Sequence, residues 1–356
     1  MSARLLLLGA GSGAANNLVR SLRAVDRPMT IIGAHHDRFV LRTAPTERRY
    51  LLPTASRGGD FVTALIRLIA AERIEVVIPT SDADVRALAV TPEGLGCRTL
   101  LPSLATIEAC QDKGVFAELL SARGVPVPET IALEALDDVE PAFARLARHA
   151  HIWCRRRRGQ GGLGALRVSR PEQARAWIEY WSEMRDVPIA DFTLAEYLPG
   201  RDFAGQALFA YGEPILVHIY ERLSYLGGAA APAGVGLAAL GRRLADRRVE
   251  DLVIAGVRAI EPMASGVFCF DAREDAAGVP RLTELNAGRF GLSAILLDLA
   301  GKVNMAETYV RLAMGEPMEP ISEPEPSDDW YIVRDYDGAP AVLRADDFFT
   351  GIDEAP

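Results

Sequence analysis

The sequence predicts a mixed α/β protein, in which a parallel α/β domain precedes lobes built on antiparallel strands. Over the first hundred or so residues, short apolar runs alternate with helical patterns in units of about 30 residues, which is typical of a parallel sheet with helices on both faces. From residue 192 onward, alternating apolar and polar residues between turn residues predict antiparallel strands. A chain of 356 residues is long enough for two or three domains.

The N-terminal region is predicted to form one doubly wound domain over residues 1–108. Its expected strands are residues 3–9, 29–34 and 75–82, and its expected helices are residues 14–25, 61–74 and 84–90. Apolar residues three to four positions apart mark the helix at 61–74.

A glycine-rich turn follows the first expected strand. Gly9, Gly11 and Ala14 match the pattern G-x-G-x-x-[GA] of dinucleotide-binding domains, so an NAD-dependent oxidoreductase is one alternative. Such a domain usually ends its second strand with an acidic residue that binds the ribose. Here the second strand ends in Gly33 and Ala34, with Asp37 arriving late, which disfavours NAD.

The rest of the chain is predicted to contain a small lobe over 109–190, a large lobe over 191–316 and a Pro- and acid-rich linker with a C-terminal tail over 317–356. A long helix is expected at 103–124, with Gly124 as its stop. Further helices are expected at 171–184 and 249–263.

The stretch HIWCRRRRGQGGLGALRV, residues 151–168, is predicted to form a strand, a glycine-rich loop and a second strand. Gly159, Gly161 and Gly162 allow the backbone to approach a polyphosphate closely, and the arginines supply charge for phosphate. No G-K-[ST] follows, so this is not a P-loop. A nucleic-acid or targeting patch and a flexible hairpin tip remain alternatives.

A predicted hairpin carries the strongest metal-binding pattern. With its turn centred on Ala277–Gly278, Asp271 faces Glu284, and Asn286 lies on the same side as Glu284. Opposed carboxylates repel each other unless a cation lies between them, and carboxylate and amide oxygens suit Mg²⁺. The alternative is a solvated hairpin whose acidic residues face water.

Composition excludes several classes of protein. The net charge of −9 argues against a general nucleic-acid binder. The four cysteines are far apart in the sequence, which favours a reduced, cytoplasmic protein, and no apolar run is long enough to span a membrane.

Several of these stretches, in this order, resemble the ATP-grasp superfamily, particularly its branch of carbamoyl phosphate synthetase and carboxylate–amine ligases. LTELNAGRFG resembles the metal motif, HIWCRRRRGQGGLG the loop over the ATP phosphates, and EYLPGRD the adenine hinge. ACQDKGVFAELLSARGVPVPET resembles the start of the small lobe. The resemblance implies an N-terminal Rossmann-like domain followed by two α+β lobes that clasp ATP.

The resemblance also implies roles for individual residues. Mg²⁺, or Mn²⁺ in its place, would be held by Asp271, Glu284 and Asn286. Arg289 would stabilise the transferring phosphoryl group, and Arg222 is a candidate for binding the substrate carboxylate. The ATP-binding residues would be Lys113, Arg155, Gly159, Gly161, Gly162, Glu196, Tyr197, Leu198 and Asp202.

Two positions depart from the family pattern. Arg155 stands where a lysine is usual, and Arg289 follows Glu284 by five residues, where many members have four. The implied activity is ADP-forming ligation of a small-molecule carboxylate and an amine through an acyl phosphate, without nucleic-acid or membrane partners and with a homodimer as one expected state. Alternatives are another acyl-phosphate-forming enzyme of the carbamoyl phosphate synthetase type and a nucleotide-binding regulatory protein without turnover.

Overall fold

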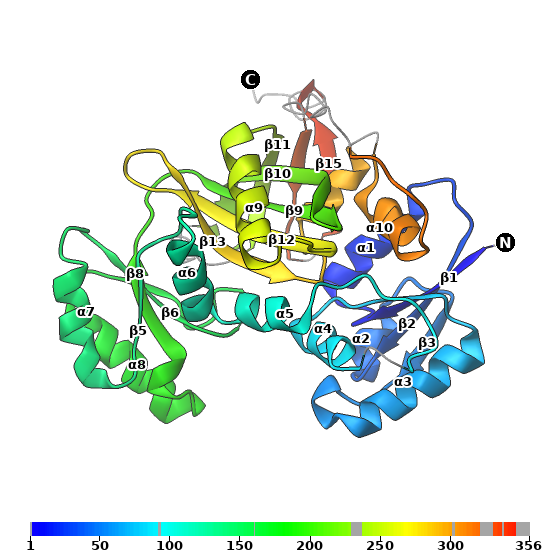
Figure 1. The fold of residues 1–356 in the computed structure, drawn as a ribbon, viewed down its shortest axis with the longest axis horizontal. Coiled ribbons are helices and arrows are strands. Elements are labelled where there is room, and N and C mark those ends of the chain that lie inside the picture. Colours follow the sequence, from blue (N-terminus) through cyan, green and yellow to red (C-terminus); the bar gives the residue numbers. More distant parts are fainter. Residues whose placement is uncertain are drawn as a thin grey trace, which may run out of the picture.

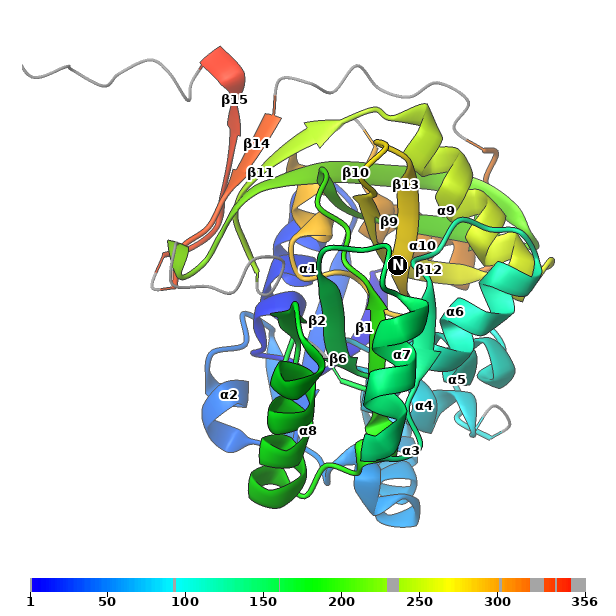
Figure 2. The same ribbon diagram turned by 90° about the vertical axis from the view of Figure 1, so that its left-hand side faces the viewer.

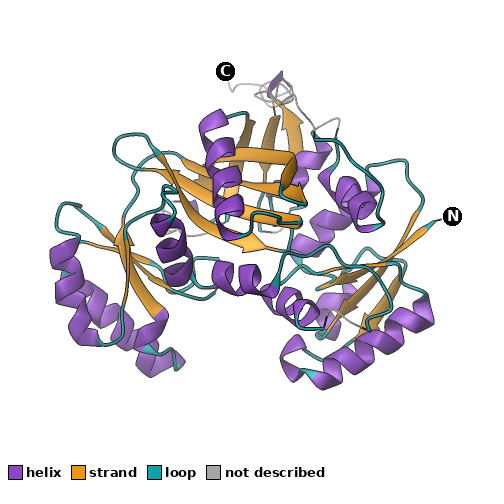
Figure 3. Cartoon of the chain, in the orientation of Figure 1, coloured by secondary structure: helices purple, strands orange, loops and turns teal. Residues whose placement is uncertain are grey.

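The computed structural model describes residues 2–91, 94–159, 161–228, 237–300, 303–320, 330–336 and 338–346, which are organised around three β-sheets (Figure 1). Figure 3 shows the helices lying along the faces of these sheets. Short 3-10 helices in the connections are η1 (Ala55–Arg57), η2 (Leu136–Asp138) and η3 (Ile189–Asp191).

The N-terminal sheet is parallel, with the strand order β3-β2-β1-β4. Its strands are β1 (Ala3–Leu8), β2 (Met29–His35), β3 (Arg48–Leu51) and β4 (Val76–Ile78). Its helices are α1 (Gly13–Arg23), α2 (Arg38–Arg42), α3 (Gly59–Glu72) and α4 (Asp82–Ala89). The predicted alternation of strands and helices is confirmed, and β3 and α2 are additions to it.

Both faces of β1 are buried, which explains its unbroken apolar sequence. Leu6 and Leu8 pack in the core beneath α3. Leu5 and Leu7 pack in a second core, shared with α1 and with helix α10 (Met305–Ala313). This second core joins the N-terminal domain to the large lobe.

The small lobe has a four-stranded antiparallel sheet in the order β5-β8-β6-β7. Its strands are β5 (Thr130–Ala132), β6 (Ile152–Arg156), β7 (Leu166–Val168) and β8 (Phe192–Glu196). Helices α7 (Val139–Arg145) and α8 (Pro171–Arg185) cover one face of it (Figures 1 and 2). The predicted strand–loop–strand at 151–168 is confirmed as β6, the loop and β7.

The large lobe has a seven-stranded antiparallel sheet in the order β13-β12-β9-β10-β11-β14-β15. Its strands are β9 (Asp202–Ala210), β10 (Glu213–Tyr225), β11 (Ala238–Leu244), β12 (Gly266–Glu274), β13 (Pro280–Ala287), β14 (Trp330–Val333) and β15 (Ala341–Arg344). Helix α9 (Arg247–Ile260) covers one face, whereas α1, α10 and the 3-10 helix η5 (Ala294–Leu299) lie on the other. The short strands β14 and β15 extend this sheet at its edge (Figure 2).

The single helix predicted at 103–124 is wrong. The chain forms α5 (Leu104–Gln111) and α6 (Lys113–Ala122), which are separated at Asp112. Asp112 has extended backbone angles, and its side chain accepts hydrogen bonds from the amides of Gly114 and Val115, as an N-cap does. Periodicity alone did not reveal this break.

Most of the predicted Pro- and acid-rich linker, residues 321–329, lies outside the described residues. Among the described residues, no helix combines the length and the apolar character that crossing a lipid bilayer requires.

Candidate active site

A cavity of about 410 Å³ lies where the small-lobe sheet faces the large-lobe sheet. Most of the predicted site residues line it: Arg155, Gly161, Gly162, Glu196, Tyr197, Leu198, Asp202, Arg222, Asp271, Glu284, Asn286 and Arg289. Lys113 and Gly159 do not line it but lie beside it, because Lys113 Nζ donates to the Gly159 carbonyl (3.0 Å) and lies 3.6 Å from Glu284 Oε2.

The hairpin of β12 and β13 has the predicted register. Asp271 is paired with Glu284, and Cys269 with Asn286. A β-bulge follows Asp271, so the register shifts by one residue toward the turn. The two carboxylates and the amide therefore lie at one end of the hairpin, on the wall of the cavity.

Glu284 is surrounded by cations. Burial by itself would raise the pKa of Glu284, but the charges of Lys113, Arg155 and Arg289 lower it below the ordinary value. Asp271 differs, because burial and the neighbouring Glu284 charge raise its pKa despite the Arg222 guanidinium. The pair therefore combines a carboxylate that is readily ionised with one that holds its proton more tightly.

Arg155 stands on β6, across the cavity from the hairpin. Only 9% of its surface is exposed, and its Nη2 donates to the Thr283 carbonyl (3.1 Å). Its Nε is buried with no hydrogen-bond partner among the described residues. Burial lowers its pKa, while the charges of Glu284 and Asp271 oppose that shift. A buried, half-satisfied guanidinium beside two carboxylates suits an anionic ligand.

Arg289 joins the large lobe to the N-terminal domain. Its Nη2 donates to Asn286 Oδ1 (2.6 Å), and its Nε is ion-paired with Asp82 at the start of α4. Asp82 was not predicted as a site residue. Its position just after a parallel strand, in the stretch PTSDAD, was the available signal, because such strand ends commonly carry binding residues.

Arg222 lies between two carboxylates that were predicted to bind different parts of MgATP. Its Nη1 is 3.0 Å from Asp202 Oδ1, and its Nη2 is ion-paired with Asp271. The other oxygen of Asp202 accepts from the Tyr225 hydroxyl. Arg222 therefore lines the cavity, but two carboxylates of the protein itself balance its charge, and its role toward a substrate carboxylate stays a prediction.

The hinge connects β8 with β9. The Glu196 amide donates to the Glu129 carbonyl (2.9 Å), and Glu196 Oε2 lies toward the Glu129 amide, so this carboxylate is held by the small lobe. Arg273, which was not predicted, donates to the Gly200 carbonyl (3.3 Å) and lies over the Tyr197 ring. Tyr197 and Leu198 line the cavity, and the contacts of Glu196 and Arg273 hold this hinge in place.

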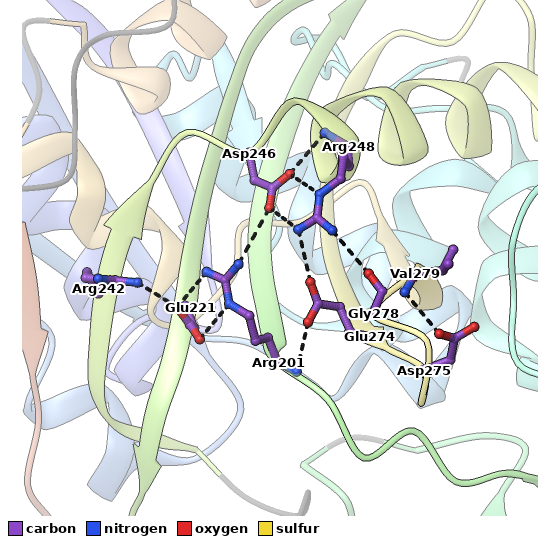
Figure 4. Close-up of polar contacts among 9 residues, drawn as sticks. All are labelled: Arg201, Glu221, Arg242, Asp246, Arg248, Glu274, Asp275, Gly278 and Val279. Carbon is purple, nitrogen blue, oxygen red and sulfur yellow. Dashed lines mark hydrogen bonds and ion pairs between the residues drawn. The ribbon is translucent and has the colours of Figure 1, made fainter.

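Figure 4 shows a network of ion pairs and hydrogen bonds that includes Arg201 and Glu221, two sequence neighbours of site residues. Arg201 precedes Asp202 in the sequence, and Glu221 precedes Arg222. The Arg201 guanidinium donates two hydrogen bonds to the Glu221 carboxylate, at 3.0 and 2.8 Å. Neither lines the cavity. Adjacent residues of a strand point to opposite faces, so Glu221 lies on the opposite face of β10 from Arg222. The network ties the ends of β9 and β10 together behind the site.

The first two glycines of the turn after β1 lie close against other parts of the chain. A Cβ at Gly9 would overlap the Thr80 hydroxyl, and a Cβ at Gly11 would overlap the Val40 carbonyl. Asp37 caps α2 by accepting from the amides of Phe39 and Val40. Gly9 and Gly11 therefore have a packing role, so their presence does not require a dinucleotide.

No known family model matches the sequence, and no curated protein matches it. Many solved structures match the fold. L-amino acid ligase from Bacillus licheniformis superposes with a TM-score of 0.71 at 14% identity, over 93% of this chain and 79% of that one. Biotin carboxylase from Campylobacter jejuni, in a β,γ-ATP complex, has a TM-score of 0.71 at 13% identity, over 92% and 74%. Carboxyaminoimidazole ribonucleotide synthase from Aspergillus clavatus, complexed with ATP, has a TM-score of 0.67 at 16% identity, over 93% and 81%.

The chain therefore has the ATP-grasp fold that the sequence motifs predicted. The parallel N-terminal domain and the two antiparallel lobes are the parts of that fold, and the cavity lies between the lobes.

Proposed function

We propose that the protein is an ADP-forming, ATP-dependent ligase that joins a small-molecule carboxylate to an amine. The observation that carries the proposal is the meeting of Asp271, Glu284 and Asn286 with Lys113, Arg155 and Arg289 at one cavity of an ATP-grasp fold. Opposed carboxylates ringed by cations suit a bound metal–polyphosphate, because the carboxylates hold the metal while the cations hold the phosphates.

The donor set fits Mg²⁺. Asp271 and Glu284 are direct cross-strand partners, and Asn286 adds an amide oxygen on the same side. Two carboxylates and one amide offer only oxygen donors, which suit a hard cation. A bound Mg²⁺ would neutralise charge on phosphate oxygens, and Mn²⁺, which favours the same ligands, is expected to replace it.

The proposed reaction has two steps. A substrate carboxylate oxygen attacks the γ-phosphorus of ATP, the bond to ADP breaks, and an acyl phosphate forms. The amine nitrogen then attacks the acyl carbon, phosphate leaves, and the nitrogen loses a proton. Arg289 and Arg155 would stabilise charge on the transferring group, and the backbone of Gly161 and Gly162 would approach the phosphates.

The hinge would bind the nucleoside. Backbone groups of Glu196, Tyr197 and Leu198 would contact adenine, and Asp202 would accept from the ribose hydroxyls. A carboxylate has lone pairs for about four hydrogen bonds, so Asp202 can bind ribose while it keeps Arg222 and Tyr225. A cytoplasmic location and a homodimer belong to the same proposal.

The test is turnover of MgATP against pools of carboxylic acids and amines, with ADP resolved from AMP. We expect ADP and phosphate to form only when a carboxylate is present. Glu284→Gln should lower kcat by about 100-fold or more, because an acyl phosphate forms only when the phosphate charge is neutralised. The control is Glu213→Gln, which removes an exposed carboxylate of β10 outside the cavity and should keep full activity.

Formation of AMP and pyrophosphate would refute the acyl-phosphate mechanism. Equal turnover by the Glu284 and Glu213 variants would refute the assignment of the site.

A further inference from the structure

A second cavity, of about 590 Å³, lies between the N-terminal domain and the large lobe. It shares three lining residues with the first cavity: Leu237, Arg289 and Leu292. The two cavities therefore meet at Arg289, the residue proposed to contact the transferring phosphoryl group. A molecule in the second cavity would reach the acyl phosphate from the side of the N-terminal domain.

One wall of this cavity carries an arginine without a carboxylate partner. Arg334 directly follows β14, and its Nη1 donates to the Ser293 hydroxyl (2.8 Å). Its Nε is buried with no hydrogen-bond partner, and no carboxylate within the described ranges forms an ion pair with it. Burial lowers its pKa. A half-buried guanidinium that has a buried, unpartnered Nε and no carboxylate partner among the described residues favours an anionic ligand.

Backbone amides at the start of α1 line the same wall. Ser12 caps the helix by accepting from the Ala15 amide, whereas Gly13 and Ala14 line the cavity. The first amides of an α-helix have no partner within the helix, and the helix dipole makes this end attractive to anions. A Cβ at Gly13 would lie 3.0 Å from Leu292, the neighbour of Ser293, so α1 and Arg334 border one region.

A carboxylate lines the same cavity. Asp84 on α4 accepts one hydrogen bond, from the Ser81 hydroxyl (2.6 Å), and no cation in the described part of the chain forms an ion pair with it. Burial raises its pKa, while the nearby His36 opposes that shift. Apolar side chains, Leu52, Pro53 and Phe61, complete the lining.

We propose that the second cavity binds the amine substrate as a zwitterionic amino acid, with its carboxylate on Arg334 and the start of α1 and its amino group toward Asp84. Arg334 belongs to the C-terminal hairpin, which thereby acquires a role in recognising the substrate. The proposal rests on the proposed ligase function, for which it names the class of acceptor. The apolar side chains leave room for the amino acid's own side chain.

Binding is tested by titration calorimetry, with the twenty L-amino acids added to full-length protein in the presence of magnesium and a non-hydrolysable ATP analogue. For the tightest binder, its carboxamide and its deaminated acid are titrated as well. We expect Arg334→Gln to weaken binding of the amino acid by about tenfold or more. The affinity for the carboxamide, which is already weak in the unmodified protein, should not change. Asp84→Asn should weaken binding of the amino acid but not binding of the deaminated acid.

Arg20→Gln is the matched control, because Arg20 Nη2 donates to the Pro340 carbonyl of the same C-terminal hairpin without lining the cavity. It should bind the amino acid as the unmodified protein does. Arg334→Lys keeps the charge and should bind with intermediate affinity, which guards against a folding defect. The analogue's own Kd should be the same in all variants.

The proposal fails if none of the twenty amino acids binds, or if Arg334→Gln and Arg20→Gln bind equally well. The ligase function fails separately, if an amino acid binds as expected but no carboxylate gives ADP in its presence. Conversely, turnover that accepts only amines without an acid group would keep the ligase and overturn this site.

Discussion

Arg222 shows how the fold balances charge in a site that is rich in carboxylates. It lies between Asp202 and Asp271, which come from different strands and are proposed to serve ribose and metal. Only 18% of its side chain is exposed, so both ion pairs are largely screened from water. One side chain thus couples the part of the site that would hold the nucleoside to the part that would hold the metal.

Replacing Arg222 by Met should destabilise the protein by about 3 kcal/mol at pH 8, because two buried carboxylates lose their counter-ion. The loss should be smaller near pH 4. The pKa of Asp271 is already raised in the folded protein and would rise further without Arg222. A carboxyl with a raised pKa costs stability once the pH exceeds its pKa in the unfolded chain. Urea unfolding at the two pH values measures this.

Arg222→Lys retains a positive charge and should lose less stability than Arg222→Met. Added Mg²⁺ should raise the Tm of Arg222→Met more than that of the unmodified protein. An equal loss at pH 4 and pH 8 would contradict the charge argument.

The sequence predicted the register of the β12–β13 hairpin, which depends on one local element. The pairing of Asp271 with Glu284 follows from the position of a turn, because strand register is fixed by counting outward from it. Asp82 and Arg334 were missed, because Asp82 pairs with Arg289, which lies 207 residues later, and Arg334 shares a cavity with residues of the distant N-terminal domain. Such contacts are decided by how domains pack, and a single sequence carries no local signal for that.

The break between α5 and α6 ties the small-lobe loop to the large-lobe core. Asp112, 4% exposed, caps α6 and is ion-paired with Arg157 (3.0 Å), at the start of the glycine-rich loop. Burial would raise the pKa of Asp112, but Arg157 and the two capped amides lower it below its ordinary value. The adjacent Lys113 donates to the Gly159 carbonyl, so two consecutive residues hold the base of the loop.

Asp112→Ala should lose about 2–3 kcal/mol of stability, since both the cap and the partner of a charged group are removed. Asp112→Asn keeps an acceptor for the cap and should lose about half as much. Both variants should raise the KM for ATP, because the loop that is proposed to cover the phosphates loses an anchor. Urea unfolding and ATP kinetics measure the two effects.

Glu118→Gln, an exposed change on α6, is the control for these variants. An ATP KM unchanged in Asp112→Asn would mean that the ion pair with Arg157 does not position the loop.

At the level of elements, the parallel α/β order and the β12–β13 hairpin were predictable, because each depends on short-range periodicity and turn residues. The division at Asp112 was not, since the flanking helices share one apolar pattern and the residue's role depends on Arg157, 45 positions later. The additional strands β14 and β15 were also not predicted. They extend the sheet beyond β11, and the sequence does not show that β11 would otherwise be an edge strand.

At the scale of the whole molecule, a buried polar cluster joins the N-terminal domain to the large lobe. Asp298 of η5 accepts from the Ser21 hydroxyl on α1 and from the Ala306 amide on α10 (3.0 Å). Its other oxygen lies 3.4 Å from His218 Nδ1 on β10. Burial raises the pKa of Asp298 to about 6 and lowers that of His218 to about 3.

These two groups should have opposite effects on stability between pH 4 and pH 6. A raised carboxyl pKa makes the fold lose stability as pH rises toward 6, whereas a lowered histidine pKa makes it gain stability over the same range. Asp298→Asn should leave only the histidine effect, so this variant should gain about 2 kcal/mol from pH 4 to pH 6 relative to the unmodified protein. Chemical unfolding at several pH values checks this.

Changing His218 to Gln in the Asp298→Asn background should remove the remaining dependence. Parallel stability curves for the unmodified protein and Asp298→Asn would show that this pair does not titrate in that range.

The ion pair of Asp82 with Arg289 has a consequence for protein engineering and for evolution by gene fusion. The two lobes around the first cavity do not form a detachable cassette, because one counter-ion of Arg289 is encoded more than 200 residues upstream. A transplant that begins at the small lobe would carry the proposed nucleotide-binding and metal-binding residues but would leave Arg289 without Asp82. Swaps of the N-terminal domain should therefore be joined downstream of α4, or bring an equivalent acidic residue at that helix start.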